Sequence, residues 1–301
     1  MNKEVKKPIN ARTLPNEELF YGHKACGGCG ESLALRHIMK VLGERTFATL
    51  PAGCMSAVSF IYPNMAFVNN AIISPFASTA AVAAGVRAGL DALGVKDAIS
   101  VGIAGDGGTA DIGIQALSGA IDRNDKIIFI TTDNEAYMNT GIQKSSLTPY
   151  GTKTTTTPAG KNLPGSITKK KNMFEIVAAH GISYAATASI GYMEDFLMKV
   201  EKAKNIEGTS YIQVFVPCPT GWGYSPEITV SLAKEAVDTG LLYLAEFENG
   251  EFKLNRNPKE FASVESYLMK QGRFKHLSKE NIMTIESQRD IKWEKMRKNW
   301  I

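Results

Sequence analysis

Two motifs in this chain of 301 residues combine groups that can bind a divalent cation. Asp106 lies in a glycine-rich segment, residues 105–108, and Asn134 follows 28 residues later. The Asp106 carboxylate, the Asn134 amide oxygen and the backbone carbonyl of Ala136 are hard oxygen ligands of the kind Mg2+ prefers. Glycines beside Asp106 would let backbone N–H groups approach phosphate oxygens closely. The spacing therefore predicts a site for a metal ion on a diphosphate.

The elements around these motifs have the pattern of an α/β sheet. The apolar run 98–104 ends at the glycines and predicts a buried parallel strand. Residues 111–121 predict a helix, with Asp111 in its first turn, where a negative charge favours the helix dipole. A second buried strand is expected over 126–132, next to Asn134. Since open α/β sheets bind ligands at the carboxyl ends of their strands, we expect the site there.

The rest of the chain alternates predicted strands with helices, and from about residue 230 the sequence becomes amphipathic and charged. Further helices are expected over residues 31–42, from 78 or 79 to 93, 173–180 and 192–204, and further strands over 46–50, 182–186 and 211–216. The polar segment 140–172 follows the metal-binding residues directly, which favours a functional loop over disorder. We expect an α/β fold, a mostly parallel sheet with helices on both faces, arranged as an N-terminal arm (1–20), a cofactor domain (21–229) and a C-terminal extension (230–301) that packs on the domain or on a partner.

Four cysteines form a second candidate site. Cys26 and Cys29 make a C-x-x-C pair, and Cys54 and Cys218 each follow a predicted strand. Thiolates bind soft metal centres, so four of them suit zinc or an iron–sulfur cluster. The pair alone also fits a thioredoxin-like redox motif or half of a zinc site, and the residues by themselves leave these alternatives open.

Composition excludes several functions. The net charge of +4 is small, and no basic stripe interleaved with aromatic residues indicates nucleic-acid binding. No apolar stretch has membrane-spanning length and the N-terminus is polar, so we expect no membrane span, no secretory signal and a cytoplasmic location. Thiols stay reduced there, which favours metal or redox chemistry over disulfides. The densest basic run, Lys169–Lys171, predicts a solvated loop.

The motifs together resemble a known family. Gly105-Asp106-Gly107 with the spaced Asn134 resembles the thiamine diphosphate (ThDP) and Mg2+ signature of ThDP-dependent enzymes. Three further segments, Asp133–Gln143, Thr148–Gly151 and Thr154–Pro158, are similar to the β subunits of the 2-oxoacid:ferredoxin oxidoreductases, most of all the pyruvate:ferredoxin oxidoreductases (pyruvate synthases). The resemblance covers roughly residues 18–225, and it implies the ThDP-binding fold.

The resemblance implies cofactors and their ligands. It implies ThDP, Mg2+ held by Asp106, Asn134 and Ala136, and one [4Fe-4S] cluster held by Cys26, Cys29, Cys54 and Cys218. The implied cofactor-binding residues are Glu31, Cys54, Gly105, Asp106, Gly107, Gly108, Asn134, Ala136, Asn139, Thr140 and Gly141. Asn139 is also the implied catalytic contact with the substrate. The expected reaction is CoA-dependent oxidative decarboxylation of pyruvate to acetyl-CoA and CO2, with electrons passed to ferredoxin.

The resemblance also implies partner subunits. The glutamate that activates ThDP lies on a pyrimidine-binding domain, which the family keeps on an α subunit, so we expect no activity from this chain alone. A γ subunit, a ferredoxin-like δ subunit or domain, and external ferredoxin complete the expected set. The resemblance would also place the basic run Lys169–Lys171 near a cofactor or a partner surface instead of in a solvated loop. The segment Asn69–Ala77 departs from the pyruvate enzymes, which keeps open another 2-oxoacid such as oxalate or a branched-chain oxoacid. A non-catalytic iron–sulfur electron-transfer subunit and a zinc-stabilised ThDP enzyme remain as alternatives of other classes.

Overall fold

The protein is built on one large sheet. The structure, a computed structural model, describes residues 9–160 and 163–300, so the first eight residues of the predicted arm lie outside the described residues. The main strands are β1 (Thr46–Pro51), β2 (Asn70–Ser74), β3 (Ile99–Gly105), β4 (Ile128–Asp133), β7 (Tyr184–Ser189), β8 (Ser210–Phe215), β9 (Ala245–Glu248) and β10 (Glu251–Leu254), and β5 (Ala159–Gly160) and β6 (Leu163–Pro164) form a small separate hairpin.

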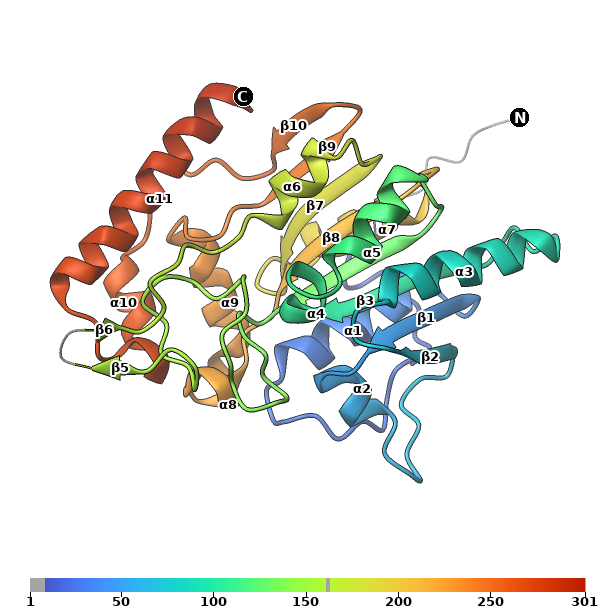
Figure 1. Ribbon diagram of the computed structural model, residues 1–301, viewed down its shortest axis with the longest axis horizontal. Coiled ribbons are helices and arrows are strands. Elements are labelled where there is room, and N and C mark those ends of the chain that lie inside the picture. Colours follow the sequence, from blue (N-terminus) through green and yellow to red (C-terminus); the bar gives the residue numbers. More distant parts are fainter. Residues whose placement is uncertain (1–8, 161–162, 301) are drawn as a thin grey trace.

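The order of strands confirms the predicted α/β class. The eight strands lie in the order β10-β9-β7-β8-β4-β3-β1-β2 (Figure 1). The six strands from β7 to β2 run parallel to one another, whereas β9 is antiparallel to both of its neighbours, β7 and β10. The chain leaves β1 toward one edge of the sheet and leaves its neighbour β3 toward the other. Such a reversal opens a crevice at the carboxyl ends of the two strands, where ligands bind.

Helices cover both faces of the sheet, as the sequence predicts. One face carries α1 (Gly30–Leu42), α7 (Met193–Lys204), α9 (Thr229–Asp238) and α10 (Val264–Met269), and the other carries α3 (Thr79–Ala92), α5 (Ile114–Asp122) and α6 (Met173–Ala179). The remaining helices are α2 (Cys54–Ser59), α4 (Asp106–Ala110), α8 (Pro219–Trp222) and α11 (Lys279–Asn299), with short 3-10 turns η1 (Pro226–Ile228) and η2 (Gly272–Phe274). Among the described residues, no helix combines the length and the apolar character needed to cross a membrane.

Alternating side chains explain why the central strands hold two cores apart. In β4, Ile128 and Ile130 belong to one core and Phe129 to the other, because successive side chains of a strand point to opposite faces. Gly102 of β3 pairs with Phe129 across the sheet. A Cβ at Gly102 would lie 2.9 Å from the Phe129 ring, so the glycine makes room for the aromatic side chain.

The segment after Asp106 differs from the prediction. Instead of one helix over 111–121, α4 begins at Asp106 itself and α5 begins at Ile114. A Cβ at Gly113 would lie 2.0 Å from the Gly108 carbonyl oxygen, so the chain turns sharply between the two helices. The prediction that Asp111 lies in a first helical turn is therefore wrong. Its carboxylate instead accepts a hydrogen bond from the Tyr137 hydroxyl at 2.7 Å.

The C-terminal region takes part in the sheet. The hairpin of β9 and β10 adds two strands beside β7, and Figure 1 shows α11 lying along the same end of the molecule. In β9 the buried Ala245 and Phe247 alternate with the partly buried Glu246 and Glu248, the period expected for a strand with one buried face. The region thus contacts the rest of the chain through backbone pairing as well as through helices.

Packing between α1 and α7 gives a stability prediction. Phe196 on α7 is fully buried in the core that also holds α1, whereas Met198 on the same helix is about half exposed. We expect Phe196→Ala to lower the free energy of unfolding by about 3–5 kcal/mol, because it leaves a cavity. The matched change Met198→Ala should cost less than about 1 kcal/mol. Urea unfolding of the purified protein measures both, and equal losses would contradict the assignment of Phe196 to this core.

Candidate functional site

A cavity of about 220 Å3 lies at the carboxyl ends of β1, β3 and β4. It brings together ten of the eleven residues that the resemblance implies as cofactor contacts, namely Glu31, Cys54, Gly105, Asp106, Gly107, Gly108, Asn134, Ala136, Asn139 and Thr140. Gly141 does not line it and instead accepts a hydrogen bond from Thr155 through its carbonyl. The sheet topology explains the assembly, because each strand delivers its next residues to the same edge.

Three oxygen-bearing groups meet inside the cavity. A terminal atom of the Asn134 amide lies 2.8 Å from the Ala136 carbonyl oxygen and 3.2 Å from Asp106 Oδ1. A rotated amide would satisfy both contacts by donating from Nδ2. A divalent cation would satisfy them as well, since a carboxylate, an amide and a carbonyl oxygen are Mg2+ ligands. The residues present therefore fit a magnesium ion.

The Asp106 carboxylate is buried, and two of its neighbours have opposite effects on its pKa. Burial raises its pKa well above the ordinary range, and the nearby charge of Asp133 raises it further. A hydrogen bond from the Ser145 hydroxyl to Asp106 Oδ2 acts in the other direction. Ser145 belongs to the long segment 140–172, so the predicted functional loop reaches the site. A buried carboxylate of this kind favours a bound cation as its charge partner.

The backbone of the 133–136 segment is held in an uncommon conformation. Glu135 has φ of 67°, in the left-handed region that side-chain-bearing residues rarely adopt. Its N–H donates to Asp133 Oδ1 at 3.1 Å, and its carbonyl accepts from the Thr148 hydroxyl at 2.7 Å. This turn places the Asn134 side chain and the Ala136 carbonyl on the same side. Local strain at such a position is typical of functional sites.

A buried ion network surrounds Glu135. Lys170 Nζ lies 2.6 Å from Asp133 Oδ2 and 2.7 Å from Glu135 Oε1, and Arg273 donates to Glu135 Oε2 at 2.6 Å. These charges lower the pKa of Glu135 despite its burial. The expectation of a solvated Lys169–Lys171 loop is therefore wrong for Lys170. A lysine run gives no sequence signal of such pairing, because its partners lie far away along the chain.

The glycines beside Asp106 have different neighbours. A Cβ at Gly107 would lie 2.2 Å from the Tyr137 ring, and one at Gly108 would lie 3.1 Å from Phe76. No atom lies within 4 Å of the position that a Cβ at Gly105 would take. Only Gly105 thus borders open space, while Gly107 is required by the aromatic ring packed on it.

Glu31 connects the cavity with the cysteines. Its carboxylate is buried at the start of α1, and Thr132 Oγ1 donates to Glu31 Oε1 at 2.7 Å. Burial raises the pKa of Glu31 to about 7, against the opposing effect of hydrogen bonds from Thr132 and Asn134. The charge of Glu31 also raises the pKa of Cys29 and Cys54, after the larger effect of their own burial. The carboxylate therefore stands between the two candidate sites.

The four cysteines lie on three adjacent segments and are free thiols. The Gly30 N–H donates to the Pro217 carbonyl at 3.3 Å, which joins the loops of Cys29 and Cys218. All three other thiols influence the pKa of Cys54, which burial raises most. The described residues nevertheless contain no group of three or more His, Cys, Asp or Glu side chains arranged to hold a metal ion. The thiols are near one another without forming a closed metal site.

Sequence reasoning missed one aromatic residue at the site. Trp222 is fully buried at the end of α8, and its Nε1–H donates to the Asn134 carbonyl at 2.8 Å. It lies four residues after Cys218, so the cysteine segment and the metal-binding turn contact each other directly. The signal in the sequence that could have indicated this contact is the position of Trp222, close along the chain to the predicted ligand Cys218.

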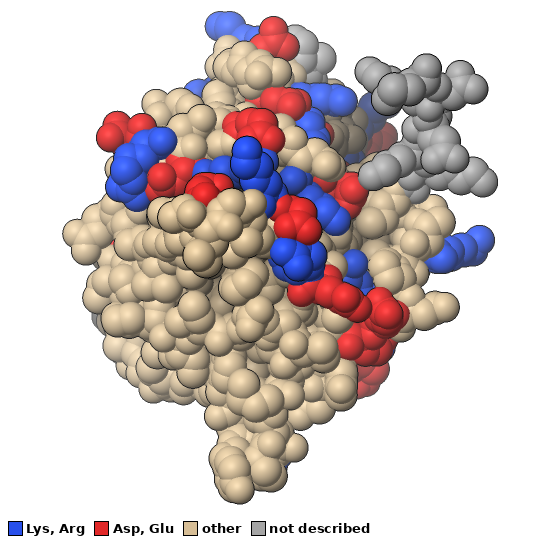
Figure 2. Space-filling view, turned by 90° about the vertical axis from the view of Figure 1, so that its right-hand side faces the viewer, with Lys and Arg blue, Asp and Glu red and all other residues tan. Residues whose placement is uncertain are grey.

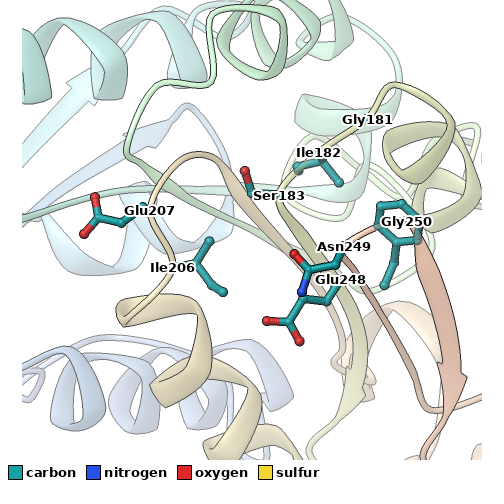
Figure 3. A pocket seen from close by; sticks show the side chains of 9 residues that line it. Gly181, Ile182, Ser183, Ile206, Glu207, Glu248, Asn249 and Gly250 are labelled. Carbon is teal, nitrogen blue, oxygen red and sulfur yellow. The ribbon is translucent and has the colours of Figure 1, made fainter.

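A larger hollow of about 410 Å3 lies at the opposite edge of the sheet, at the amino ends of β7 and β8 (Figure 3). Its carboxylates are paired, with Glu207 2.6 Å from Lys126 and Glu248 2.8 Å from Lys202. Figure 3 shows Ile206 between these two acids. None of the predicted functional residues lines this hollow.

Comparisons with known proteins identify a domain family over the part of the chain that contains most of the cavity's residues. A family model described as "Thiamine pyrophosphate enzyme, C-terminal TPP binding domain" matches residues 51–214, which includes the Asp106 and Asn134 motifs. A solved 2-oxoglutarate:ferredoxin oxidoreductase from Magnetococcus marinus shares the fold, with a TM-score of 0.58 and 22% identity over 69% of this chain and 70% of that chain. Fold and matched domain define the class of thiamine diphosphate-binding enzymes.

Curated relatives narrow the class to a family. Ketoisovalerate oxidoreductase subunit VorB of Pyrococcus horikoshii is 48% identical over 98% of this chain and 97% of its own length. Pyruvate synthase subunit PorB of Methanothermobacter thermautotrophicus is 48% identical over 94% of this chain and 99% of its own length. The chain belongs to the β subunits of the 2-oxoacid:ferredoxin oxidoreductases, which confirms the resemblance and assigns it to the oxidoreductases.

Proposed function

We propose that this chain binds ThDP and Mg2+ in a heteromeric enzyme that oxidatively decarboxylates a 2-oxoacid and passes the electrons to ferredoxin. The proposed preferred substrate is pyruvate, in a CoA-dependent reaction. The observation that carries the proposal is the convergence of the Asp106 carboxylate, the Asn134 side-chain amide and the Ala136 carbonyl in a cavity at the carboxyl ends of the strands. The match to a thiamine pyrophosphate-binding domain supports it.

The residues of the cavity have separable roles in this proposal. When bound, ThDP supplies a carbon nucleophile and an electron sink for decarboxylation. Asp106, Asn134 and the Ala136 carbonyl hold the metal ion, and the open space at Gly105 admits the diphosphate. The apolar walls, from Leu50, Met55, Phe76, Ile103 and Met138, exclude water from the reacting carbon. Asn139 and Thr140, at the exposed rim, contact substrate and cofactor.

The four cysteines are the proposed ligands of one [4Fe-4S] cluster. Their type suits iron, and they lie together beside Glu31 and the cavity, although their arrangement in the described residues is not that of a closed site. Cys54 lines the cavity as well, so it belongs to both proposed sites.

A partner subunit is proposed to cover the uncharged face beside the cavity. Residues 46–86 contain no Asp, Glu, Lys, Arg or His, a run of 41 residues. The face in Figure 2 carries its charged side chains in the upper part and along the right-hand side, and none at the lower left and the bottom. Exposed apolar side chains in the run are Ile61, Tyr62, Met65, Val68, Ile72 and Ile73, and β2 is an edge strand. Such a surface is typical of a protein–protein interface.

The proposed partner is an α subunit with the pyrimidine-binding domain and the activating glutamate, together with a γ subunit and a ferredoxin-like δ subunit or domain. The relatives at 48% identity carry the names of ketoisovalerate oxidoreductase and pyruvate synthase subunits, which supports a multisubunit enzyme. Because these two relatives are equally similar, a branched-chain oxoacid is the alternative substrate.

Purification of the native complex under anaerobic conditions tests the function. The complex should reduce a viologen dye only with a 2-oxoacid and CoA together, and pyruvate should give the highest kcat/KM in a panel with oxalate, 2-oxoglutarate and branched-chain oxoacids. Preference for a branched-chain oxoacid would overturn the pyruvate assignment. Dye reduction that persists without ThDP would contradict the enzyme proposed here.

A further inference from the structure

The C-terminal region reaches the proposed metal site through one side chain. Arg273, in η2, lies 138 positions after Glu135 and only 5% of it is exposed. Its Nη2 donates to Glu135 Oε2 at 2.6 Å, and the guanidinium carbon lies 3.5 Å from the centre of the Trp222 ring. Arginine combines planar stacking with directed hydrogen bonds in this way, and lysine cannot.

These two contacts hold Asn134 from both sides. Glu135 is the next residue in the chain, and Trp222 donates through Nε1 to the Asn134 carbonyl at 2.8 Å. The Arg273 guanidinium therefore connects Glu135 with Trp222. Both of these residues contact Asn134, the first through the chain and the second through a hydrogen bond. Lys170 also binds Glu135, but it contacts Asp133 rather than Trp222.

The position of Arg273 is itself fixed and has a cost. Arg273 Nε donates to Gln271 Oε1 at 2.9 Å, and the Gln271 amide donates to the Tyr267 carbonyl at 3.0 Å. Nη1 is buried without a hydrogen-bond partner among the described residues. A buried donor without a partner destabilises the fold. The hydrogen bonds to Glu135 and Gln271 and the stacking on Trp222 must offset that loss.

We propose that Arg273 is a positioning residue for the divalent cation: it holds Glu135 in its left-handed conformation and Trp222 against Asn134, so that the Asn134 amide and the Ala136 carbonyl face Asp106. The inference rests on the function proposed above and adds to it a role for the C-terminal region in cofactor binding. Arg273 acts through its neighbours and contacts neither metal nor cofactor.

Titration of Mg2+ at fixed ThDP tests the proposal on the cofactor-depleted complex. Isothermal titration calorimetry should show about 10–100-fold weaker Mg2+-dependent binding for Arg273→Gln, the range found when outer partners of metal ligands are removed. Arg273→Lys should also be weaker than the wild type, because it keeps the charge but loses the stacked fork. Lys270→Gln is the matched control, since Lys270 is a half-exposed cation on the same region and pairs with Glu235.

A second variant keeps the test valid if Arg273 variants fold poorly. Trp222→Phe keeps a ring beneath the guanidinium and removes the Nε1–H that Asn134 accepts, so the Mg2+ requirement should rise there too. Thermal unfolding without Mg2+ reports any general loss of stability separately. Wild-type complex that fails to bind ThDP with Mg2+ would overturn the proposed function. Wild-type binding with unchanged Mg2+ requirement in Arg273→Gln, Arg273→Lys and Trp222→Phe would overturn the role of Arg273 alone.

Discussion

Asp106→Ala abolishes 2-oxoacid oxidation and weakens Mg2+-dependent ThDP binding by more than about 100-fold, beyond the loss typical for outer partners of metal ligands. The side chain contributes the only carboxylate among the three groups that converge in the cavity. Without it, the amide of Asn134 and the Ala136 carbonyl provide no negative charge for a divalent ion. Calorimetry with ThDP and Mg2+, together with viologen reduction, measures both losses.

The control for this change lies on the next helix. Asp122 is an exposed aspartate at the end of α5, so Asp122→Ala should leave binding and turnover unchanged. Iron content should stay at the wild-type level in Asp106→Ala, because the cysteines do not depend on this carboxylate. Unchanged turnover in Asp106→Ala would remove the support for a metal-bound cofactor and favour a non-catalytic electron-transfer subunit.

Cys218→Ser and Cys29→Ser are expected to show the reciprocal pattern. The native complex should contain about four iron atoms for each copy of this chain, in addition to those of its partners, with broad absorption at roughly 400 nm. Each serine variant should lose most of that iron and its dye reduction, because hydroxyls replace thiolate poorly at iron. ThDP and Mg2+ binding should remain, since neither side chain lines the cavity.

Metal analysis decides between this outcome and its alternatives. Zinc in place of iron in the wild type would favour a zinc-stabilised ThDP enzyme. Iron that stays at the wild-type level in both serine variants would show that these thiols are not its ligands. Cys54→Ser is less informative, because Cys54 lines the cavity and its loss would act on both proposed sites.

Local sequence patterns were sufficient to predict the parallel core and the meeting of Asp106 with Asn134, whereas Glu31, Cys54, Asn139 and Thr140 were expected as cofactor contacts only from the family resemblance. Strands β3 and β4 read as apolar runs because they are buried on both faces, and the polar residues that follow them mark the sheet edge where Asp106 and Asn134 meet. The short motif around Asp106 carries its information within a few residues, so distance along the chain does not obscure it.

Features that depend on distant contacts were not predictable in this way. At the break between α4 and α5, Gly113 approaches the Gly108 carbonyl so closely that a Cβ there would clash, and helical periodicity does not reveal this close approach. Lys170 looks like part of a solvated basic run, yet it forms ion pairs with the buried Asp133 and Glu135. The addition of β9 beside β7 likewise depends on pairing between strands that are far apart in the chain.

The long sequence separation between Glu135 and Arg273 also bears on how the protein is made. Chains emerge from the ribosome N-terminus first, so Asn134 and its turn are synthesised well before η2. The contact of Arg273 with Glu135 in that turn can form only when nearly the whole polypeptide has been released. Nascent or truncated forms would thus lack a finished coenzyme pocket, which delays loading until synthesis is complete.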